Sequence, residues 1–343
     1  MGSAMNSTVF LGAALTLAGG VLQGTFAVPM KYARKWGHEN IWVIFCLTGM
    51  VIFPWLLTTS AVPSLALVYA STSARTLLAV VFFGILWGVG ATLTGLGLRM
   101  LGIGLGLAII LGLSASVGSV VPLLALTPEK VFSTQGTYYL VGTLVMFAGI
   151  ALVAVAGSLR ERSSDGAGRA ERASFAVGLL VCIASGVLSS TLNFSYAFGA
   201  ELIENARQAG TSAVWAPNIA AAPATTGGFL ANLLYCAHLM RRNHTFDRFW
   251  LPGSVGHWLL GVMMGAFWYG GLVAYGMGLS RMGSFGTVAG WPLLMGAIIV
   301  SSNAASLLTG EWHRAGRRAK AYLFAGSAVI LAALMVLAVA QKP

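Results

Sequence analysis

Three apolar stretches of the sequence, residues 174–197, 216–240 and 283–308, carry uncharged polar side chains at helical spacing. In the first, Ser185, Ser189, Asn193 and Tyr196 follow one another at steps of four, four and three, so they share one face of a helix. Amides and hydroxyls can hydrogen-bond the hydroxyl groups of a ligand. Because polar side chains are costly inside a bilayer unless they are paired or face water, the three faces predict a wet cleft. Their members are Cys182, Ser185, Ser189, Asn193 and Tyr196; Asn218, Ala222, Thr225, Phe229, Asn232 and Cys236; and Pro292, Gly296, Asn303, Ser306 and Gly310.

Aromatic rings accompany these polar faces. Trp268 and Tyr275 lie seven positions apart on one face of residues 253–279, and Trp87 and Trp291 lie in neighbouring stretches. Indole rings stack on the apolar C–H face of a sugar, so the mixture favours a neutral polyol. The alternative is that Ser, Thr and Asn only hold helices together while Trp forms an interfacial belt. The predicted substrate-binding residues are Gln23, Trp87, Asn193, Asn232, Trp268, Tyr275, Trp291 and Asn303.

Residues for catalysis are missing from the apolar stretches. No Asp, Glu, Lys or Arg lies near the middle of a predicted span, and no Ser/His/Asp set, metal-ligand cluster or pair of buried carboxylates occurs. The sequence therefore predicts no enzyme and no metal site, and it disfavours charged substrates. Any proton coupling would need a titratable group at the margin of a span. The candidates are Glu129, Glu201, Glu204, Glu311 and His257.

The elements that position these residues are predicted from hydropathy. Of the 343 residues, 57% are hydrophobic and only 8% are charged, whereas a soluble domain is about one quarter charged. With a mean hydropathy of +0.82, the chain is predicted to be an all-α integral membrane protein. The ten predicted spans are residues 8–30, 40–60, 75–98, 102–127, 135–158, 174–197, 216–240, 253–279, 283–308 and 320–341.

The positive charge is distributed unevenly between the two sides of the predicted membrane. With the first terminus outside, fifteen of the twenty Lys and Arg residues fall in inner loops, which predicts that both termini are periplasmic. This distribution explains the net charge of +11 without a nucleic-acid partner. The fifteen are Lys31, Arg34, Lys35, Arg99, Arg160, Arg162, Arg169, Arg172, Arg241, Arg242, Arg248, Arg314, Arg317, Arg318 and Lys320.

The two halves of the chain share a sequence pattern. Seven ungapped identities recur at an offset of 181, and a weaker match relates residues 12–25 to 178–191 at an offset of 166. Five spans per copy is an odd number, so the copies would enter the membrane in opposite orientations, an architecture that suits alternating access. We therefore predict two inverted five-helix repeats, residues 1–158 and 174–343, joined by a cytoplasmic charged linker at 159–173. The seven pairs are Gly84/Gly265, Trp87/Trp268, Gly90/Gly271, Gly95/Gly276, Gly97/Gly278, Leu98/Leu279 and Gly102/Gly283.

Several short segments form a recognisable pattern, namely residues 26–31, 35–36, 54–55, 83–90, 99–102 and 311–318. Together they resemble the L-rhamnose-proton symporter family, which belongs to the drug/metabolite transporter superfamily. The resemblance runs nearly end to end, and it implies uptake of a sugar with a proton across a bacterial inner membrane. It also singles out Glu204 as the proton-coupling candidate, because the family has corresponding residues there and at Gly210, Gly227, Gly228 and Asn232.

The chain departs from the rhamnose transporters at two stretches that the resemblance places in the cavity. One is Ala91–Thr94, and the other is Thr287–Pro292. The expected substrate is therefore a small neutral sugar, either L-rhamnose or a related deoxysugar. The proton gradient is the only cofactor expected, and the expected partners are the sugar, the proton and the lipid bilayer. An uncoupled or exporting transporter of another small neutral substrate remains the alternative.

Overall fold

The computed structural model describes residues 2–101, 103–126, 128–164, 172–283, 286–310, 312–313 and 315–339. All regular elements in these ranges are helical. The α-helices are α1 Gly2–Thr25, α2 His38–Leu47, α3 Phe53–Ala61, α4 Leu65–Ser71, α5 Ala74–Leu101, α6 Ile103–Leu126, α7 Thr134–Ser164, α8 Arg172–Ser189, α9 Thr191–Phe198, α10 Ala200–Gln208, α11 Ala221–Asn243, α12 Val255–Leu279, α13 Gly286–Leu308 and α14 Arg317–Val339. The shorter elements are η1 Val28–Tyr32, the π-helical η2 Thr48–Ile52, η3 Pro128–Lys130, η4 Ala216–Ala220 and η5 Phe246–Trp250.

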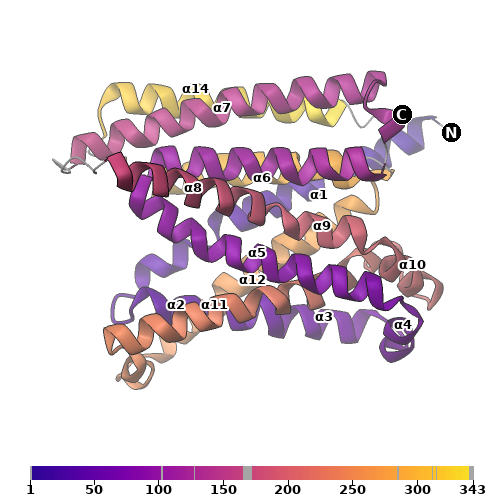
Figure 1. Cartoon of the computed structure of the whole chain (residues 1–343), viewed down its shortest axis with the longest axis horizontal. Coiled ribbons are helices and arrows are strands. Elements are labelled where there is room, and N and C mark those ends of the chain that lie inside the picture. Colours follow the sequence, from indigo (N-terminus) through magenta and orange to yellow (C-terminus); the bar gives the residue numbers. More distant parts are fainter. Residues whose placement is uncertain are drawn as a thin grey trace.

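Ten candidate membrane spans are found among the described residues, so the prediction of an all-α protein with ten spans is confirmed. The spans lie side by side, and the two ends of the chain lie at the same end of the bundle (Figure 1). At one edge α7 packs along α14. In the interior α1 packs against α12 and α13, while α5 packs against α8 and α11.

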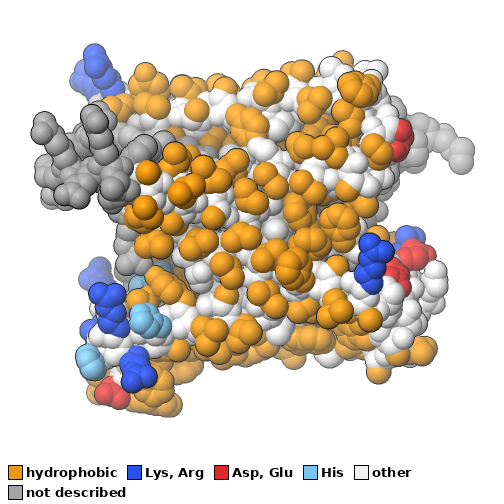
Figure 2. Space-filling view, viewed as in Figure 1, with side chains coloured by type: hydrophobic (Ala, Val, Ile, Leu, Met, Phe, Trp, Pro, Cys, Tyr) orange, Lys and Arg blue, Asp and Glu red, His pale blue; other side chains and the backbone are white. Residues whose placement is uncertain are grey.

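The long sides of the bundle are covered by apolar side chains, whereas charged side chains gather at its two ends (Figure 2). Lys31 and Lys35 follow α1, Arg160 lies in the last turns of α7 and Arg241 in the last turn of α11, all at one end. We call this the basic end and the opposite one the α10 end. Of the inner-loop residues predicted above, Arg169 and Arg314 lie outside the described residues, as do residues 165–171 of the predicted linker.

Three of the five glycine pairs that recur at the offset of 181 lie where helices cross. A Cβ at Gly84 of α5 would overlap the carbonyl of Ala224 in α11, and one at Gly265 of α12 would lie 2.8 Å from the backbone nitrogen of Gly49 in η2. Glycine at such a crossing lets two backbones approach closely. The two members of this pair therefore pack against corresponding spans of opposite halves.

Two further glycine pairs repeat this correspondence. Gly90 contacts Ser189 of α8 while Gly271 contacts Gln23 of α1, and these two partners are 166 positions apart. Gly97 meets Cys182 and Gly278 meets Thr16, which are again 166 apart. Both offsets of the sequence thus reappear as matched contacts.

The second span is a helix broken near its middle rather than the uniform helix expected over residues 40–60. Pro54 has no backbone N–H, so the carbonyl of Met50 four residues earlier loses its helical donor. The hydroxyl of Thr225 in α11 donates to this carbonyl at 2.7 Å. The π-helical turn η2 ends at Ile52, two residues before Pro54. Thr225 therefore supplies a hydrogen bond to the Met50 carbonyl that lipid could not supply.

The sixth span continues beyond the predicted end at residue 197 as far as Gln208. It consists of α8, α9 and α10, which meet at Ser190 and Gly199. The polar composition of residues 200–208 suggested a loop that follows the span, but Leu202 and Ala206 are fully buried on one side of α10. The extension places Glu201 and Glu204 on a helix at the α10 end.

Candidate functional site

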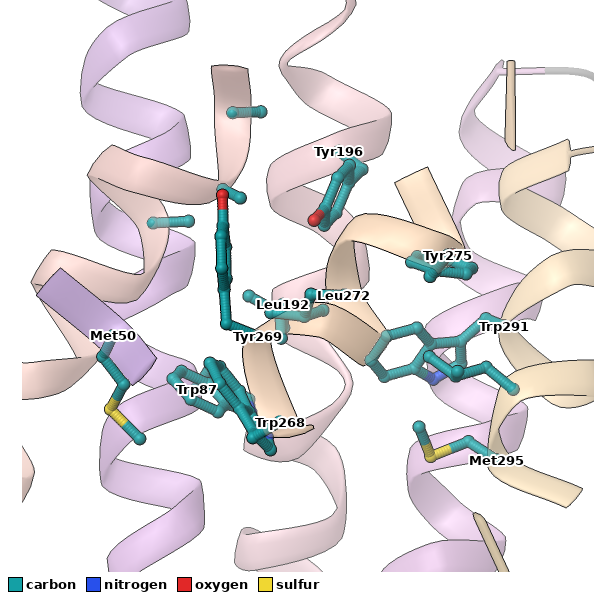
Figure 3. Close-up of a cluster of buried hydrophobic side chains, with 14 of the residues drawn as sticks. Met50, Trp87, Leu192, Tyr196, Trp268, Tyr269, Leu272, Tyr275, Trp291 and Met295 are labelled. Atoms are coloured by element: carbon teal, nitrogen blue, oxygen red, sulfur yellow. The ribbon is translucent and has the colours of Figure 1, made fainter. Parts of the chain in front are cut away.

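Two tryptophans from opposite halves of the chain stack at the centre of the bundle. The rings of Trp87 in α5 and Trp268 in α12 lie 5.4 Å apart with an interplanar angle of 21° (Figure 3). Phe45 of α2 meets Trp268 edge-on at 5.9 Å. The amide of Gln23 donates to the carbonyl of Trp268 at 3.3 Å. Three of the predicted site residues, Gln23, Trp87 and Trp268, are therefore brought together.

A second group of predicted residues forms one hydrogen-bonded unit. The hydroxyl of Tyr275 donates to Oδ1 of Asn193 at 2.6 Å, and Nδ2 of Asn193 donates to the carbonyl of Gly118 at 2.6 Å. Gly118 precedes Pro122 by four residues, so this carbonyl is one that the proline deprives of its helical donor. Trp291 lies 5.8 Å from the Tyr275 ring and donates to the carbonyl of Ser114. In this state Asn193 therefore bonds to protein atoms through both ends of its amide.

Asn232 lines a cavity of about 470 Å³ between α2, α5 and α11. Its Oδ1 accepts a hydrogen bond from Nε1 of Trp42 at 3.2 Å, and its Nδ2 donates to the carbonyl of Gly228. The volume lies within the range of about 300–1,000 Å³ that small-molecule sites occupy. Other lining residues include His38, Glu39, Thr92, Tyr235 and Asn243, so the wall is rich in polar groups. We call this space the α2–α11 cavity.

Glu39, on the wall of the α2–α11 cavity, was not among the acidic residues that the sequence singled out. Its side chain is only 4% exposed, and it accepts hydrogen bonds from Oγ1 of Thr245 at 2.6 Å and from Nδ2 of Asn243 at 3.2 Å. Glu129, Glu201, Glu204 and Asp247 are all exposed. Among the acidic side chains that the structure describes, Glu39 is thus the buried one. The feature of the sequence that could have pointed to Glu39 is its position, one residue before the predicted span at 40–60.

Asn303 lies apart from the other predicted residues, in a cavity of about 340 Å³ between α1, α7 and α13. Its Nδ2 donates to Oγ of Ser327 in α14 at 3.5 Å. The lining also includes Lys31, Arg160 and Trp312, so the cavity lies toward the basic end. Members of the second and third predicted polar faces, Asn232 and Asn303, therefore line two separate cavities in this state, and no residue of the first face lines either one.

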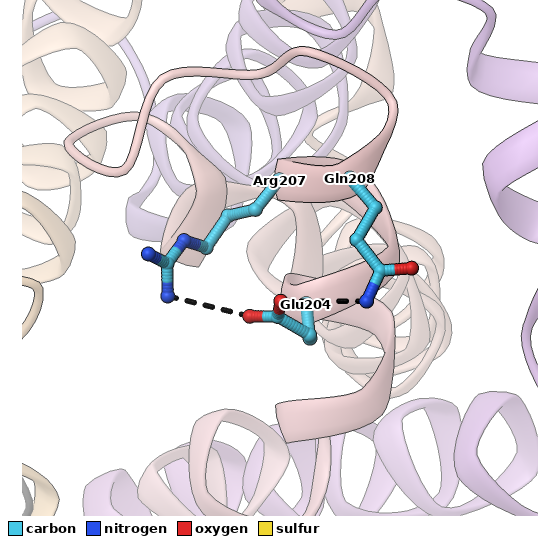
Figure 4. A network of polar contacts seen from close by, with 3 residues as sticks. All are labelled: Glu204, Arg207 and Gln208. Atoms are coloured by element: carbon cyan, nitrogen blue, oxygen red, sulfur yellow. Dashed lines mark hydrogen bonds and ion pairs between the residues drawn. The ribbon is translucent and has the colours of Figure 1, made fainter.

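Glu204 is exposed at the α10 end rather than buried in a cavity (Figure 4). Its carboxylate lies 3.3 Å from Nη1 of Arg207, and both side chains are 52% exposed. Gln208 donates to its other oxygen at 3.4 Å. An exposed pair one helical turn apart contributes at most about 0.5 kcal/mol.

Glu201 connects the two halves at the α10 end. Its carboxylate accepts hydrogen bonds from the backbone N–H of Ser73 at 2.7 Å and from the Ser73 hydroxyl at 2.6 Å. Thr76 donates to it as well, and Asn205 donates to Thr72 at 3.0 Å. These contacts tie α10 to the start of α5.

A further group of buried polar residues shows no hydrogen-bond partner in this state. Both amide atoms of Asn218 and the hydroxyls of Tyr196 and Tyr269 are unpaired, although the three residues are only 2%, 2% and 4% exposed. A buried polar group without a partner costs about 1–3 kcal/mol. Asn218 and Tyr196 belong to polar faces seen in the sequence, whereas Tyr269 carried no such signal.

Groups of three or more His, Cys, Asp or Glu side chains that could hold a metal ion were not found among the described residues. A bundle of ten apolar helices that encloses polar cavities is typical of membrane transporters. Comparison with known proteins gives the family. The chain matches the description "L-rhamnose-proton symport protein" over residues 5–341, and it belongs to that family.

Two bacterial relatives illustrate the similarity. The chain is 27% identical over 345 residues to an L-rhamnose-proton symporter of Shigella dysenteriae, covering 98% of this chain and 99% of the relative. It is 28% identical over 336 residues to one of Klebsiella pneumoniae, covering 96% and 97%. Membership of a symport family makes the chain a transporter rather than an enzyme. With its ten apolar helices, it is a multi-pass protein of the bacterial inner membrane.

Proposed function

We propose that the protein takes up a small neutral sugar, L-rhamnose or a related deoxysugar, together with a proton. The observation that carries this proposal is the family match over residues 5–341, because it covers every candidate span. The relatives bear the name L-rhamnose-proton symporter at nearly full length. The uncoupled or exporting alternative has no such observation in its favour.

Alternating access follows from two inverted repeats of five spans, residues 1–158 and 174–343. The matched glycine contacts support this arrangement. So does the packing of the spans, since α5 packs on α8 and α11 as α12 packs on α1 and α2. Exchange of the conformations of the two halves would turn a cavity open on one side into one open on the other.

The basic end is the cytoplasmic side in this proposal, and both termini are periplasmic. The cavities of about 470 and 340 Å³ both lie toward the basic end, while the bonds of Glu201 and Asn205 hold α10 against the start of α5. This combination supports an inward-facing state. A reporter fused after residue 343 should therefore be active if it requires the periplasm, and cytoplasmic activity alone would contradict the orientation.

The proton site that we favour is Glu39. A coupling acid must respond to the state of the transport cavity, and Glu39 is buried on its wall, whereas Glu204 is exposed and paired with Arg207. The titratable groups that face Glu39 are His38 on α2 and Cys236 on α11. Glu204 remains the candidate that the family resemblance suggests.

Uptake into proteoliposomes tests the function directly. With an inward proton gradient, labelled L-rhamnose or a related deoxysugar should accumulate above its external concentration, and a protonophore should abolish the accumulation. Accumulation that survives the protonophore would favour an uncoupled or differently driven transporter. Counterflow with a panel of neutral sugars would identify the preferred substrate.

Substitution of Trp268 or Asn232 should abolish uptake while membrane expression persists. Trp268→Ala removes half of the central indole stack, and Asn232→Ala removes the amide that bonds Trp42 on the cavity wall. Counterflow and immunoblotting of membranes would be measured in parallel. Trp250→Ala, at a residue 76% exposed beyond α11, is the matched control for loss of an indole. Full transport by both site variants would show that neither Trp268 nor Asn232 belongs to the substrate site.

A further inference from the structure

Three residues with unpaired polar atoms, Asn218, Tyr196 and Tyr269, come from η4, α9 and α12, and η4 packs against both helices. Tyr269 and Gly276 are seven positions apart on one face of α12, and Oδ1 of Asn218 lies 2.7 Å from where a Cβ on Gly276 would be. Figure 3 shows the hydroxyls of Tyr196 and Tyr269 in the same region, on one side of the Trp87–Trp268 stack. We call these three residues the unpaired cluster.

The backbone around the unpaired cluster is irregular in the way that ligand sites of transporters are. Asn218 lies in the 3-10 turn η4, which precedes α11 and begins beside Pro217. Tyr196 lies in α9, a short helix bounded by breaks at Ser190 and Gly199. Membrane transporters place substrate sites at such discontinuous helices.

Packing alone does not account for the unpaired cluster. Ser185, Thr191 and Thr225 show how this chain holds its helices together, since each donates to a backbone carbonyl of another span. The four atoms of the unpaired cluster make no such bond. Buried polar groups of native structures are normally paired with protein atoms or water, so each unpaired one calls for an explanation. Tyr269 also lines an open groove of about 410 Å³ with Leu56, Ser60 and Trp215, whereas Asn218 and Tyr196 do not line it.

We propose that Asn218, Tyr196 and Tyr269 form a subsite for the hydroxyl groups of a neutral sugar, filled when the α10 end opens and closed in the present state. The inference rests on the proposed function. The amide of Asn218 offers a donor and an acceptor side by side, which suits two adjacent hydroxyls, and each phenol can donate or accept. The stacked indoles of Trp87 and Trp268 lie next to the cluster and provide an apolar face. A sugar that pairs these atoms would stabilise the open state relative to this one.

The test removes the unpaired polar atoms with little change in the shape of each side chain. Tyr196→Phe and Tyr269→Phe delete only a hydroxyl, and Asn218→Leu replaces the amide at similar volume. Purified full-length protein would be assayed for equilibrium binding of labelled neutral monosaccharides, including L-rhamnose, and for its melting temperature. Each variant should raise the sugar Kd at least about tenfold, since a buried sugar hydroxyl loses its partner. The melting temperature should stay the same or rise, because the deleted atoms are unpaired in this state.

Two control variants separate binding from folding. Tyr275→Phe deletes a hydroxyl that bonds Asn193, so its melting temperature should fall. Tyr138→Phe, at a side chain 47% exposed on α7, should change neither quantity. Site variants whose Kd stays within about twofold of wild type would overturn this inference and leave the proposed function intact. Melting temperatures lowered as far as that of Tyr275→Phe would overturn it too. Wild-type protein that binds none of the sugars would overturn the proposed function and this inference with it.

Discussion

Glu39→Gln is expected to abolish proton-driven accumulation of sugar while exchange of sugar across the membrane persists. A proton-motive force of about 100 mV supplies about 2.3 kcal/mol per proton, enough for roughly fifty-fold accumulation. Glutamine cannot take up the proton, but its carbonyl can still accept the hydrogen bond from Thr245. The accumulation ratio should therefore fall to about one. Proteoliposome uptake with and without a proton gradient measures the accumulation ratio, and counterflow measures the exchange of sugar.

Glu204→Gln distinguishes this geometry from the family resemblance. If Glu39 couples the proton, Glu204→Gln should accumulate sugar as the wild type does, because that carboxylate is exposed beside Arg207. Asp247→Asn removes an exposed acid of η5 and serves as a matched control. Loss of accumulation in Glu204→Gln with full accumulation in Glu39→Gln would show that the resemblance, not burial, identifies the coupling acid.

Gly84→Ala is expected to prevent folding or to lower stability severely. The added Cβ would overlap the carbonyl of Ala224, and a backbone atom cannot move aside as a flexible side chain can. To make room for the methyl group, α5 and α11 would have to move apart, and the close packing that holds membrane helices together would be lost. The measurement is the yield of monodisperse protein in detergent and its melting temperature.

Gly95→Ala in the same helix is the control for Gly84→Ala. Nothing lies within 4 Å of a Cβ at that position, so normal yield is expected. The two variants make the same chemical change, and helix propensity favours alanine at both positions. Equal stability of both variants would contradict the role of Gly84 as a crossing point.

The fold followed from the sequence where the signal was local. Hydropathy marked ten spans because a helix must expose apolar side chains over the thickness of the bilayer. Three of the glycine pairs at the offset of 181 marked helix crossings, since close packing tolerates no side chain there. The π-helical turn at Thr48–Ile52 could not be predicted in this way. It depends on Pro54 together with Thr225, which is more than 170 positions away.

The candidate site was predictable only as a set of residue types. Trp87 and Trp268 meet as their repeat positions suggest, but Asn193 pairs with Tyr275 and Gly118 in this state. Glu39 was overlooked because the span was expected to begin at residue 40, whereas α2 begins at His38 and Thr245 of a distant loop covers the carboxylate.

The sequence by itself determined that this chain is a hydrophobic, sparsely charged bundle of ten spans with most of its positive charge at one end. Those properties are set residue by residue through contact with lipid or water. The tertiary structure decided which polar side chains hold helices together, which line cavities and which are left unpaired. That division depends on partners supplied by other spans, and helical spacing within one span contains no information about them.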